Sequence, residues 1–368
     1  MEWLDLGARV LPILGFLVAI TVVAELADRI GIFHALAYLA ARLGRGSVLG
    51  LWLLVVAIAT LATAVLSLDT TAVLLTPVVL ALARLLSLNA ALFAYTTVWL
   101  ANTASLILPV SNLTNLLAVS RLVDTDPEVA SVSGFALLMW PAATTAMVIT
   151  VLLLAVLFRR SLRGRYERPR WRSVGDRVLF GVAATVCAAL GPAFALGANV
   201  TLVAGVAALI MVGLCWARQP RLLSLRLVPW RLVIMVSVLF VLVQLGHELG
   251  LAGALAVVSG TGSSPVAQLQ LAAVAAGTAN LANNLPVFLA LEPLADTPRR
   301  MAALLVGVNA GPLILPWGSL ATLLWAARCR AAEIEVCWPQ FIRRGLLLVP
   351  LVLIGCTAAM LVVHGQPA

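Results

Sequence analysis

Long apolar segments separated by short polar connections make up most of this chain. Several of these segments are long enough to cross the roughly 30 Å hydrocarbon core of a bilayer as a helix. They are 8–28, 90–121, 133–158, 177–197, 198–217, 229–247, 300–328 and 338–363. The pattern predicts an all-α polytopic membrane protein with about eight full spans.

Two further apolar segments, 48–86 and 264–298, contain polar residues at their centres. The interruptions are Ser67-Leu-Asp-Thr-Thr71 in the first and Asn280-Leu-Ala-Asn-Asn-Leu-Pro286 in the second. Free backbone polar groups are tolerated at membrane depth only where protein or a water-filled cavity surrounds them. We therefore expect both segments to form re-entrant hairpins, which enter and leave the membrane on one side.

A stretch of sixteen residues occurs twice, 207 positions apart. Asn102–Leu117 aligns without a gap to Asn309–Leu324, and eight of the sixteen positions are identical. Each copy interrupts an apolar helix with proline, followed by Ser, Asn, Gly or Thr. Paired interrupted segments in corresponding halves of a chain point to the substrate site of a secondary transporter. The repeat therefore predicts a carrier with two discontinuous helices.

Composition agrees with this class. The chain has 368 residues, of which 62% are hydrophobic and 11% charged, whereas soluble domains carry roughly 25% charged residues. The net charge is +9, but all 24 basic residues are arginines in the connections between apolar segments. We interpret them as topology determinants and expect no nucleic-acid partner. The absence of lysine excludes P-loop and Schiff-base chemistry, and no cofactor is expected.

Catalytic and metal chemistry find little support in the sequence. The five cysteines are scattered, so neither a disulfide framework nor a metal site is expected. An intramembrane enzyme would need a nucleophile with a histidine, or two carboxylates, at membrane depth. None of the three histidines lies near an interrupted segment. We therefore predict that the protein is not an enzyme.

The distribution of arginine predicts the orientation. Eight arginines lie between Arg159 and Arg177 against only two acids, so this segment is predicted to be cytoplasmic by the positive-inside rule. Counting spans outward leaves only Arg9, Arg121, Arg299 and Arg300 outside. The first hairpin then opens toward the cytoplasm and the second toward the exterior. Because the two hairpins open in opposite directions, the chain is predicted to contain an inverted repeat. It is predicted to lie in the inner or plasma membrane.

Three parts are predicted along the chain. Residues 1–158 form the first inverted repeat, 159–177 a basic cytoplasmic linker, and 178–368 the second repeat. Shorter mixed segments, 31–45 and 247–258, suit interfacial helices that lead into the hairpins. Only one span precedes the first hairpin in its repeat, whereas three precede the second, so the first repeat has a shortened scaffold.

Four groups of residues at the interruptions form a characteristic set. They are Asp69–Pro77, Ala101–Ser105 with Val110–Asn115, Ala282–Pro286, and Gly311–Pro312 with Pro316–Trp325. In these residues the chain resembles the arsenite/antimonite efflux permease family of the ion-transporter superfamily, and the resemblance covers nearly the whole chain. It implies an inverted-repeat ion-transporter fold and export of arsenite or antimonite. It also implies a possible soluble partner, an arsenite ATPase.

The interruptions supply the candidate site residues. The predicted substrate-binding residues are Asn102, Thr103, Ser111, Asn112, Thr114, Asn115, Asn280, Asn283, Asn284, Gly318, Ser319 and Thr322. Amides and hydroxyls offer both donors and acceptors, and no arginine lies at a predicted tip. The set suits a small neutral polyhydroxyl solute such as arsenite trihydroxide, or a small oxyanion. The alternative is that these groups only join helices to one another.

Asp69, beside Thr70 and Thr71 at the first hairpin tip, is the only acid predicted to lie deep in the core. An ionisable residue at membrane depth is costly and by default a functional candidate. Proton coupling is the leading interpretation. A static hydrogen-bonding role and a sodium ligand are the alternatives.

These observations lead to one functional prediction. The chain is expected to be a secondary active transporter that exports arsenite or antimonite, coupled to proton influx by alternating access. A sodium/proton antiporter or a small-anion, dicarboxylate-like carrier of the same fold is the alternative. The expected partners are the inorganic solute, protons and the lipid bilayer.

Overall fold

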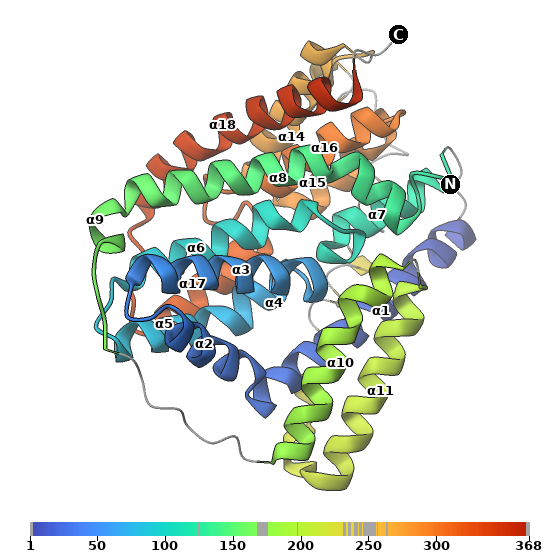
Figure 1. Ribbon diagram of the computed structural model, residues 1–368. Coiled ribbons are helices and arrows are strands. Elements are labelled where there is room, and N and C mark those ends of the chain that lie inside the picture. The colour runs from blue at the N-terminus through green and yellow to red at the C-terminus, as the bar shows by residue number, and fades with distance from the viewer. Residues whose placement is uncertain are drawn as a thin grey trace.

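The described part of the chain is built of helices packed side by side (Figure 1). The computed structural model describes residues 3–123, 126–167, 176–196, 198–230 and 264–365, with isolated residues between 231 and 263. Within these ranges, strand-like pairing is limited to one bridge between Ser47 and Arg165. The predicted all-α class is therefore confirmed.

Seven helical segments among the described residues are long and apolar enough to cross a bilayer. They are Leu11–Ile30, Val48–Leu66, Leu68–Leu85, Val132–Leu157, Arg177–Phe194, Val200–Arg218 and Trp338–Val363. The set differs from the predicted eight because both arms of the first hairpin pass the length criterion, whereas the two broken helices are divided into halves that are too short. The predicted span 229–247 and most of the predicted interfacial helix 247–258 lie outside the described residues.

The segment 48–86 forms a helical hairpin. Its first arm is α3 (Val48–Leu66), and its second arm consists of α4 (Leu68–Thr70), a turn of π-helix η1 (Thr71–Leu75) and α5 (Thr76–Leu85). The interfacial helix expected before it is α2 (Ile32–Leu43). Single π-helical turns are rare and occur frequently at functional sites, and this one directly follows the hairpin tip.

The segment 264–298 forms the second hairpin, from α14 (Pro265–Ala282), α15 (Asn284–Leu291) and η6 (Glu292–Leu294). Each hairpin reverses at a single non-glycine residue with positive φ, Ser67 at 102° and Asn283 at 79°. Their ψ angles are 161° and 153°. Residues other than glycine rarely adopt this conformation, at a cost of about 1–3 kcal/mol. The surrounding structure must therefore hold both turns in place.

Both copies of the sixteen-residue repeat interrupt a helix. The first lies between α6 (Ala90–Thr103) and α7 (Leu113–Leu122), and the second between α16 (Pro298–Ala310) and α17 (Leu320–Ala331). Asn112 caps α7 by accepting from the backbone N–H of Thr114 at 3.3 Å, and Ser319 caps α17 by accepting from that of Thr322 at 3.1 Å. Asn112 and Ser319 are equivalent positions of the repeat, so both helices resume with the same capping chemistry.

Close contact between α14 and α16 holds the second half together. A methyl group at Gly307 of α16 would lie 2.5 Å from the carbonyl oxygen of Ala272 and 2.6 Å from Cβ of Ala275, both on α14. Small residues allow this approach between membrane helices, where apolar surface alone supplies little driving force. Two long helices, α8 (Val132–Leu157) and α18 (Trp338–His364), run side by side along this half (Figure 1).

The first part of the basic linker is bound to α2 and to the turn that precedes the first hairpin. It begins with α9 (Arg159–Leu162). The hydroxyl of Tyr166 donates to the carbonyl oxygen of Ala41 at 2.6 Å, and its backbone N–H donates to that of Gly46 at 3.0 Å. Residues 168–175 lie outside the described residues. The division into two inverted repeats joined by this linker stays a prediction.

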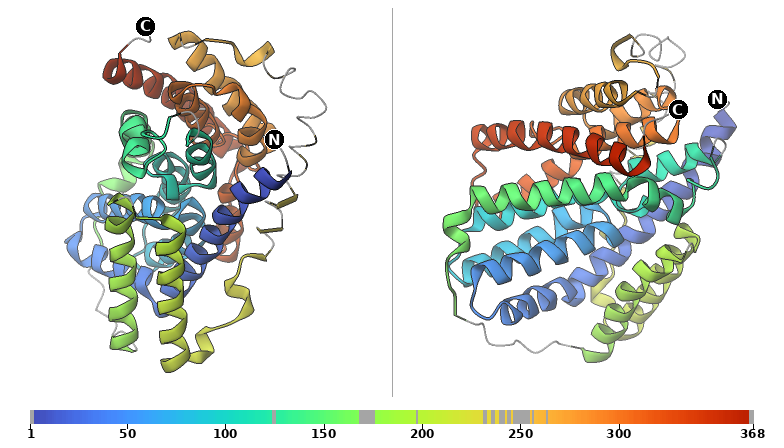
Figure 2. Two further views of the ribbon diagram at one scale, coloured as in Figure 1. Left: turned by 90° about the vertical axis from the view of Figure 1, so that its right-hand side faces the viewer. Right: turned by 45° about the horizontal axis from the view of Figure 1, so that its top comes forward.

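Three helices pack against one another at one side of the molecule (Figure 2). They are α1 (Trp3–Ile30), α10 (Arg177–Ala195) and α11 (Val200–Arg218), which share a small apolar core around Leu26, Leu179 and Met211. Asp176 caps α10 and also accepts from Nε of Arg218 at 2.7 Å. This ion pair joins the first turn of α10 to the last turn of α11.

Removing the Asp176 carboxyl group should destabilise this helix pair in a pH-dependent way. The hydrogen bond from Arg218, followed by that from the Leu179 backbone, holds the pKa of Asp176 below its usual value. Because the unfolded chain then binds the proton more readily, the contribution is complete above the usual pKa of about 3.9 and is lost as the pH falls toward the lowered value. We expect Asp176→Ala to lower the melting temperature at pH 7. The difference from wild type should shrink below pH 4, and an equal difference at pH 7 and pH 3 would contradict this account.

Candidate functional site

Asn309 lies at the centre of a buried hydrogen-bond cluster that joins the two halves of the chain. Its Oδ1 accepts from Asn112 Nδ2 at 2.8 Å and from Thr114 Oγ1 at 2.7 Å, and its Nδ2 donates to Asn115 Oδ1 at 2.7 Å. None of these four residues is more than 3% exposed. The last turn of α16 is thereby bonded to the first turn of α7.

The unwound chain between α6 and α7 is bonded by other side chains. Asn115 Nδ2 donates to the carbonyl oxygens of Ser105 at 2.6 Å and Leu108 at 2.9 Å. Ser111 Oγ donates to the carbonyl oxygen of Ala64, near the end of α3, at 3.0 Å. Carbonyl groups at the end of an interrupted helix have no hydrogen-bond donor within the helix. The side chains of Asn115 and Ser111 supply donors to such carbonyl groups.

Asn280 of the second hairpin performs the same task at the second break. Its Oδ1 accepts from the backbone N–H groups of Ile314 at 3.1 Å and Leu315 at 2.8 Å, and its Nδ2 donates to the carbonyl oxygen of Gly311 at 2.9 Å. A Cβ atom at Gly318 would lie 3.0 Å from Asn280 Oδ1. The amide group of Asn280 is therefore fully committed, and Gly318 leaves room for it.

Three of the neighbouring predicted residues, Asn283, Ser319 and Thr322, also make local hydrogen bonds. Asn283 Nδ2 donates to the carbonyl oxygen of Trp317 at 3.1 Å, and Asn284 is buried beside it in the first turn of α15. The hydroxyls of Ser319 and Thr322 lie 2.9 Å apart at the start of α17. The second break is thus tied to its own hairpin.

The tip of the first hairpin is held by hydroxyl groups that leave its carboxyl group uncommitted. Oγ1 of Thr71 lies 2.8 Å from that of Thr63, and Oγ1 of Thr70 donates to the carbonyl oxygen of Leu66 at 2.9 Å. Asp69 is half-buried and has no hydrogen bond or ion pair within the part of the chain that the structure describes. The carboxyl group is therefore free to bind a proton, a cation or an O–H donor.

The side chains of Asn102 and Thr103, at the end of α6, differ in whether all their polar atoms have hydrogen-bond partners. Thr103 Oγ1 donates to the carbonyl oxygen of Trp99 at 2.9 Å and accepts from Thr150 of α8 at 3.2 Å. Asn102 Nδ2 donates to the carbonyl oxygen of Val98 at 2.8 Å. Asn102 Oδ1 is buried and has no partner among the described residues. An unpaired buried acceptor of this kind costs about 1–3 kcal/mol.

Most of the predicted site residues fall into two groups, one at each break. At the first break, Asn112, Thr114 and Asn115 are hydrogen-bonded to Asn309, and Ser111 is bonded to the end of α3. At the second break, Asn280 and Asn283 are bonded to the backbone of the break, which continues through Gly318 to the Ser319–Thr322 pair. No hydrogen bond among the described residues joins the groups. The first hairpin tip and the end of α6 belong to neither, although the tip packs against both α6 and α17.

Neither the two groups nor the first hairpin tip contains an arginine side chain among the described residues. Among the described residues, none of these side chains accepts a hydrogen bond from an arginine. The sequence prediction omitted Asn309, which makes three side-chain hydrogen bonds between the halves. The signal was present, because Asn309 aligns with Asn102 in the sixteen-residue repeat.

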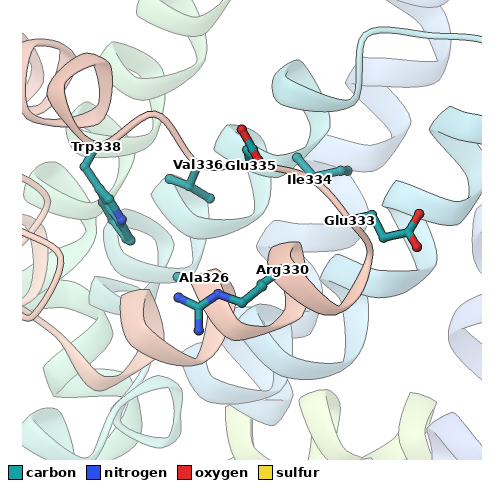
Figure 3. Close-up of a pocket in the computed structure, with 7 residues that line it drawn as sticks. All are labelled: Ala326, Arg330, Glu333, Ile334, Glu335, Val336 and Trp338. Carbon is teal, nitrogen blue, oxygen red and sulfur yellow. The ribbon is translucent and has the colours of Figure 1, made fainter.

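A pocket of about 550 Å³ lies at the other end of α17 (Figure 3). Its lining residues are Ala326, Arg330, Glu333, Ile334, Glu335, Val336 and Trp338. Arg84, at the end of α5, donates to the carbonyl oxygen of Ala332 and lies 3.8 Å from Glu333, which places the ends of α5 and α17 together. No predicted site residue lines this pocket, so it is distinct from the polar interruptions.

The comparison with known protein families decides the class. A family model described as "Citrate transporter" (CitMHS) matches residues 8–327. The chain belongs to the citrate transporter family. Members of this family are membrane transporters, so the chain is a multi-pass transporter of the cell membrane and not an enzyme. Both predictions are confirmed.

The similar curated proteins are arsenical pump membrane proteins. That of Escherichia coli K12 is 29% identical, and the alignment covers 93% of this chain and 84% of the relative. That of Yersinia enterocolitica is 27% identical with the same coverage. A putative one from Bacillus subtilis 168 is 25% identical over 94% of this chain and 86% of the relative. The resemblance to arsenite efflux permeases of the ion-transporter superfamily is thereby confirmed.

A solved structure supports the fold. The YdaH transporter of Alcanivorax borkumensis, whose crystal structure is described as having an unusual topology, superposes with a TM-score of 0.57. The match covers 100% of this chain and 91% of YdaH at 15% identity. At that identity the likeness concerns the fold alone. The two chains therefore share an overall fold.

Proposed function

We propose that this transporter exports arsenite or antimonite, coupled to proton influx by alternating access. The observation that carries the proposal is a set of amides and hydroxyls at both helix interruptions, none of which accepts a hydrogen bond from an arginine among the described residues. Capture of a carboxylate favours cationic, bidentate donors, whereas a neutral trihydroxide matches groups that donate and accept. The relatives named arsenical pump membrane proteins support the same solute class.

Asp69 supports the proton-coupled part of the proposal. It is the one acid at the first hairpin tip, and it makes no hydrogen bond or ion pair within the described residues. A static capping role would require such a bond. Uncommitted ionisable groups at membrane depth are by default functional. A soluble arsenite ATPase stays a partner implied only by the resemblance.

Asp69→Asn should abolish the coupling of arsenite export to the proton gradient. The amide keeps the size of the side chain but cannot exchange a proton. In an arsenite-sensitive host without its own exporter, we expect wild type to restore growth on arsenite and Asp69→Asn to fail. In everted vesicles the proton-driven rate of arsenite uptake should fall at least about tenfold, a change equivalent to about 1.4 kcal/mol.

The matched control is Glu128→Gln, the same exchange of carboxyl for amide on an exposed loop. It should protect cells as wild type does. Asp69→Asn vesicles that transport arsenite with unchanged pH dependence would exclude coupling through Asp69. Sodium-dependent proton movement without protection from arsenite would favour a sodium/proton antiporter instead.

The description of the matching family favours a second candidate, a carrier of citrate or a similar small anion. Uptake of radiolabelled citrate into the same vesicles distinguishes the two. Citrate uptake that arsenite does not inhibit would support this candidate and contradict arsenite export.

A further inference from the structure

The two halves of the chain present the same three elements around two equivalent positions. We call them the first junction and the second junction. The first junction comprises the first hairpin tip (Asp69–Thr71), the end of α6 (Asn102) and the start of α17 (Ser319–Thr322). The second junction comprises the second hairpin tip (Asn280–Asn284), the end of α16 (Asn309) and the start of α7 (Asn112–Asn115). In each junction the hairpin contacts both half-helices.

The register of α5 against α6 brings the first tip and Asn102 to one level. The two helices are consecutive and antiparallel, and Thr76 Oγ1 donates to Thr97 Oγ1 at 3.0 Å. Thr71 lies five residues before Thr76, and Asn102 lies five residues beyond Thr97. Both steps lead away from the connecting loop by a similar distance, so Asn102 and the tip lie at a similar height.

The register of α17 brings its first turn to the same level. Because α17 ends beside the end of α5, it also runs antiparallel to α6, and Trp325 Nε1 donates to the carbonyl oxygen of Ala94 at 2.9 Å. Ser319 precedes Trp325 by six residues and Asn102 follows Ala94 by eight. At 1.5 Å per residue these steps are about 9 Å and 12 Å, so Ser319 and Asn102 lie within one helical turn of height.

The second junction is closed by the protein itself. Asn309 uses its amide oxygen for two hydrogen bonds and its amide nitrogen for a third, all to the start of α7. Asn280 of the facing tip uses its oxygen for two backbone N–H groups of the second break. The amide oxygens of Asn309 and Asn280 therefore each already accept two hydrogen bonds.

The first junction is not closed in this way. Asn102, the repeat equivalent of Asn309, is 0% exposed, yet its Oδ1 has no partner among the described residues. Ser319, the equivalent of Asn112, pairs with Thr322 instead of reaching across. Asp69 is also uncommitted. Both unused groups, an amide oxygen and a carboxyl group, are hydrogen-bond acceptors.

We propose that the solute binds at the first junction alone, where Asn102 Oδ1 and the Asp69 carboxyl group accept hydrogen bonds from its hydroxyls, while Asn309 acts as a positioning residue that fills the second junction. This inference rests on the proposed function and specifies its site and solute class. The ligand is a small neutral hydroxide that donates O–H groups. Ionised citrate presents three carboxylates, which are acceptors, and a single hydroxyl donor, so it fits this pair of acceptors poorly. Asn102 is fully buried in this conformation, so it is not accessible from solvent. The solute therefore enters in another state of the cycle.

The same arrangement gives a reason for exchange between solute and proton. If Asp69 accepts a solute hydroxyl when ionised, a proton bound to the carboxylate removes that acceptor. The two ligands therefore exclude each other at one group. This competition is what export of the solute against an inward proton flow requires.

The test is the kinetics of arsenite uptake into everted vesicles for wild type, Asn102→Leu and Asn102→Asp. Leucine removes the acceptor at similar volume, so we expect the KM for arsenite to rise at least about tenfold. The maximal rate should change little, and the melting temperature should stay equal or rise. Asn102→Asp retains an acceptor and should keep a KM closer to that of wild type. Antimonite should compete with arsenite, and citrate should not.

The outcomes separate this inference from the proposed function. Wild-type vesicles that accumulate no arsenite contradict the proposed function. Wild-type uptake whose KM is unchanged in a folded Asn102→Leu variant leaves that function intact and overturns the site. Competition by citrate, or uptake that requires sodium, overturns the assignment of a hydroxyl-donating ligand.

Discussion

Asn309→Leu should destabilise the folded protein by about 3 kcal/mol or more and abolish transport. Leucine has a similar volume, but it leaves Asn112 Nδ2, Thr114 Oγ1 and Asn115 Oδ1 without their partner in a buried cluster. Each buried polar group left unpaired costs about 1–3 kcal/mol. The measurement is the melting temperature of the purified protein in detergent, followed with arsenite uptake in vesicles.

Asn309→Asp is the graded control. It keeps the acceptor oxygen for Asn112 and Thr114 and loses only the donor to Asn115, so its melting temperature should lie between those of wild type and Asn309→Leu. Equal stability of all three proteins would show that the cluster contributes little to joining the two halves.

Gly307→Ala should also destabilise the protein, by about 1–3 kcal/mol. The added methyl group would stand 2.5 Å from the carbonyl oxygen of Ala272, and a backbone atom of a packed helix cannot move aside as a flexible side chain can. We expect a lower melting temperature and, because α16 carries Asn309, a lower rate of arsenite uptake.

Gly277→Ala provides the comparison on the neighbouring helix. A Cβ atom at Gly277 of α14 would meet nothing within 4 Å, and alanine favours a helix over glycine by about 1 kcal/mol. This variant should be as stable as wild type or more so. If Gly307→Ala has the same melting temperature as Gly277→Ala, the close contact between α14 and α16 contributes little to the stability of the protein.

The positions of the hairpins and broken helices could be predicted because polar residues inside apolar segments are incompatible with free exposure to lipid. The interruptions at Ser67-Leu-Asp-Thr-Thr71 and Asn280–Pro286 became the two tips, and the two copies of the repeat became the two breaks. The capping residues Asn112 and Ser319 follow from the same pattern, since Asn and Ser are preferred where a helix begins.

The connections between halves could not be predicted in the same way. The hydrogen bonds of Asn309 cross 194 to 197 positions of the sequence, and no local pattern specifies such a pairing. The same holds for Asn102, because only the packed structure reveals that the amide oxygen of one of two equivalent asparagines has no partner among the described residues. Among the described residues the number of spans differed because each arm of the first hairpin is long enough to count as a span, whereas the half-helices of the broken helices are too short.

The two hairpin turns at Ser67 and Asn283 have a consequence for the durability of the protein. Each holds a side chain in a backbone conformation suited to glycine, so the neighbouring contacts and not the turn residue keep the shape. Glycine at either position would relieve the strain but would also let the arms pivot. The stability of the fold and the rate of the transport cycle are therefore linked at these two positions. Selection for one of these properties is expected to act against the other.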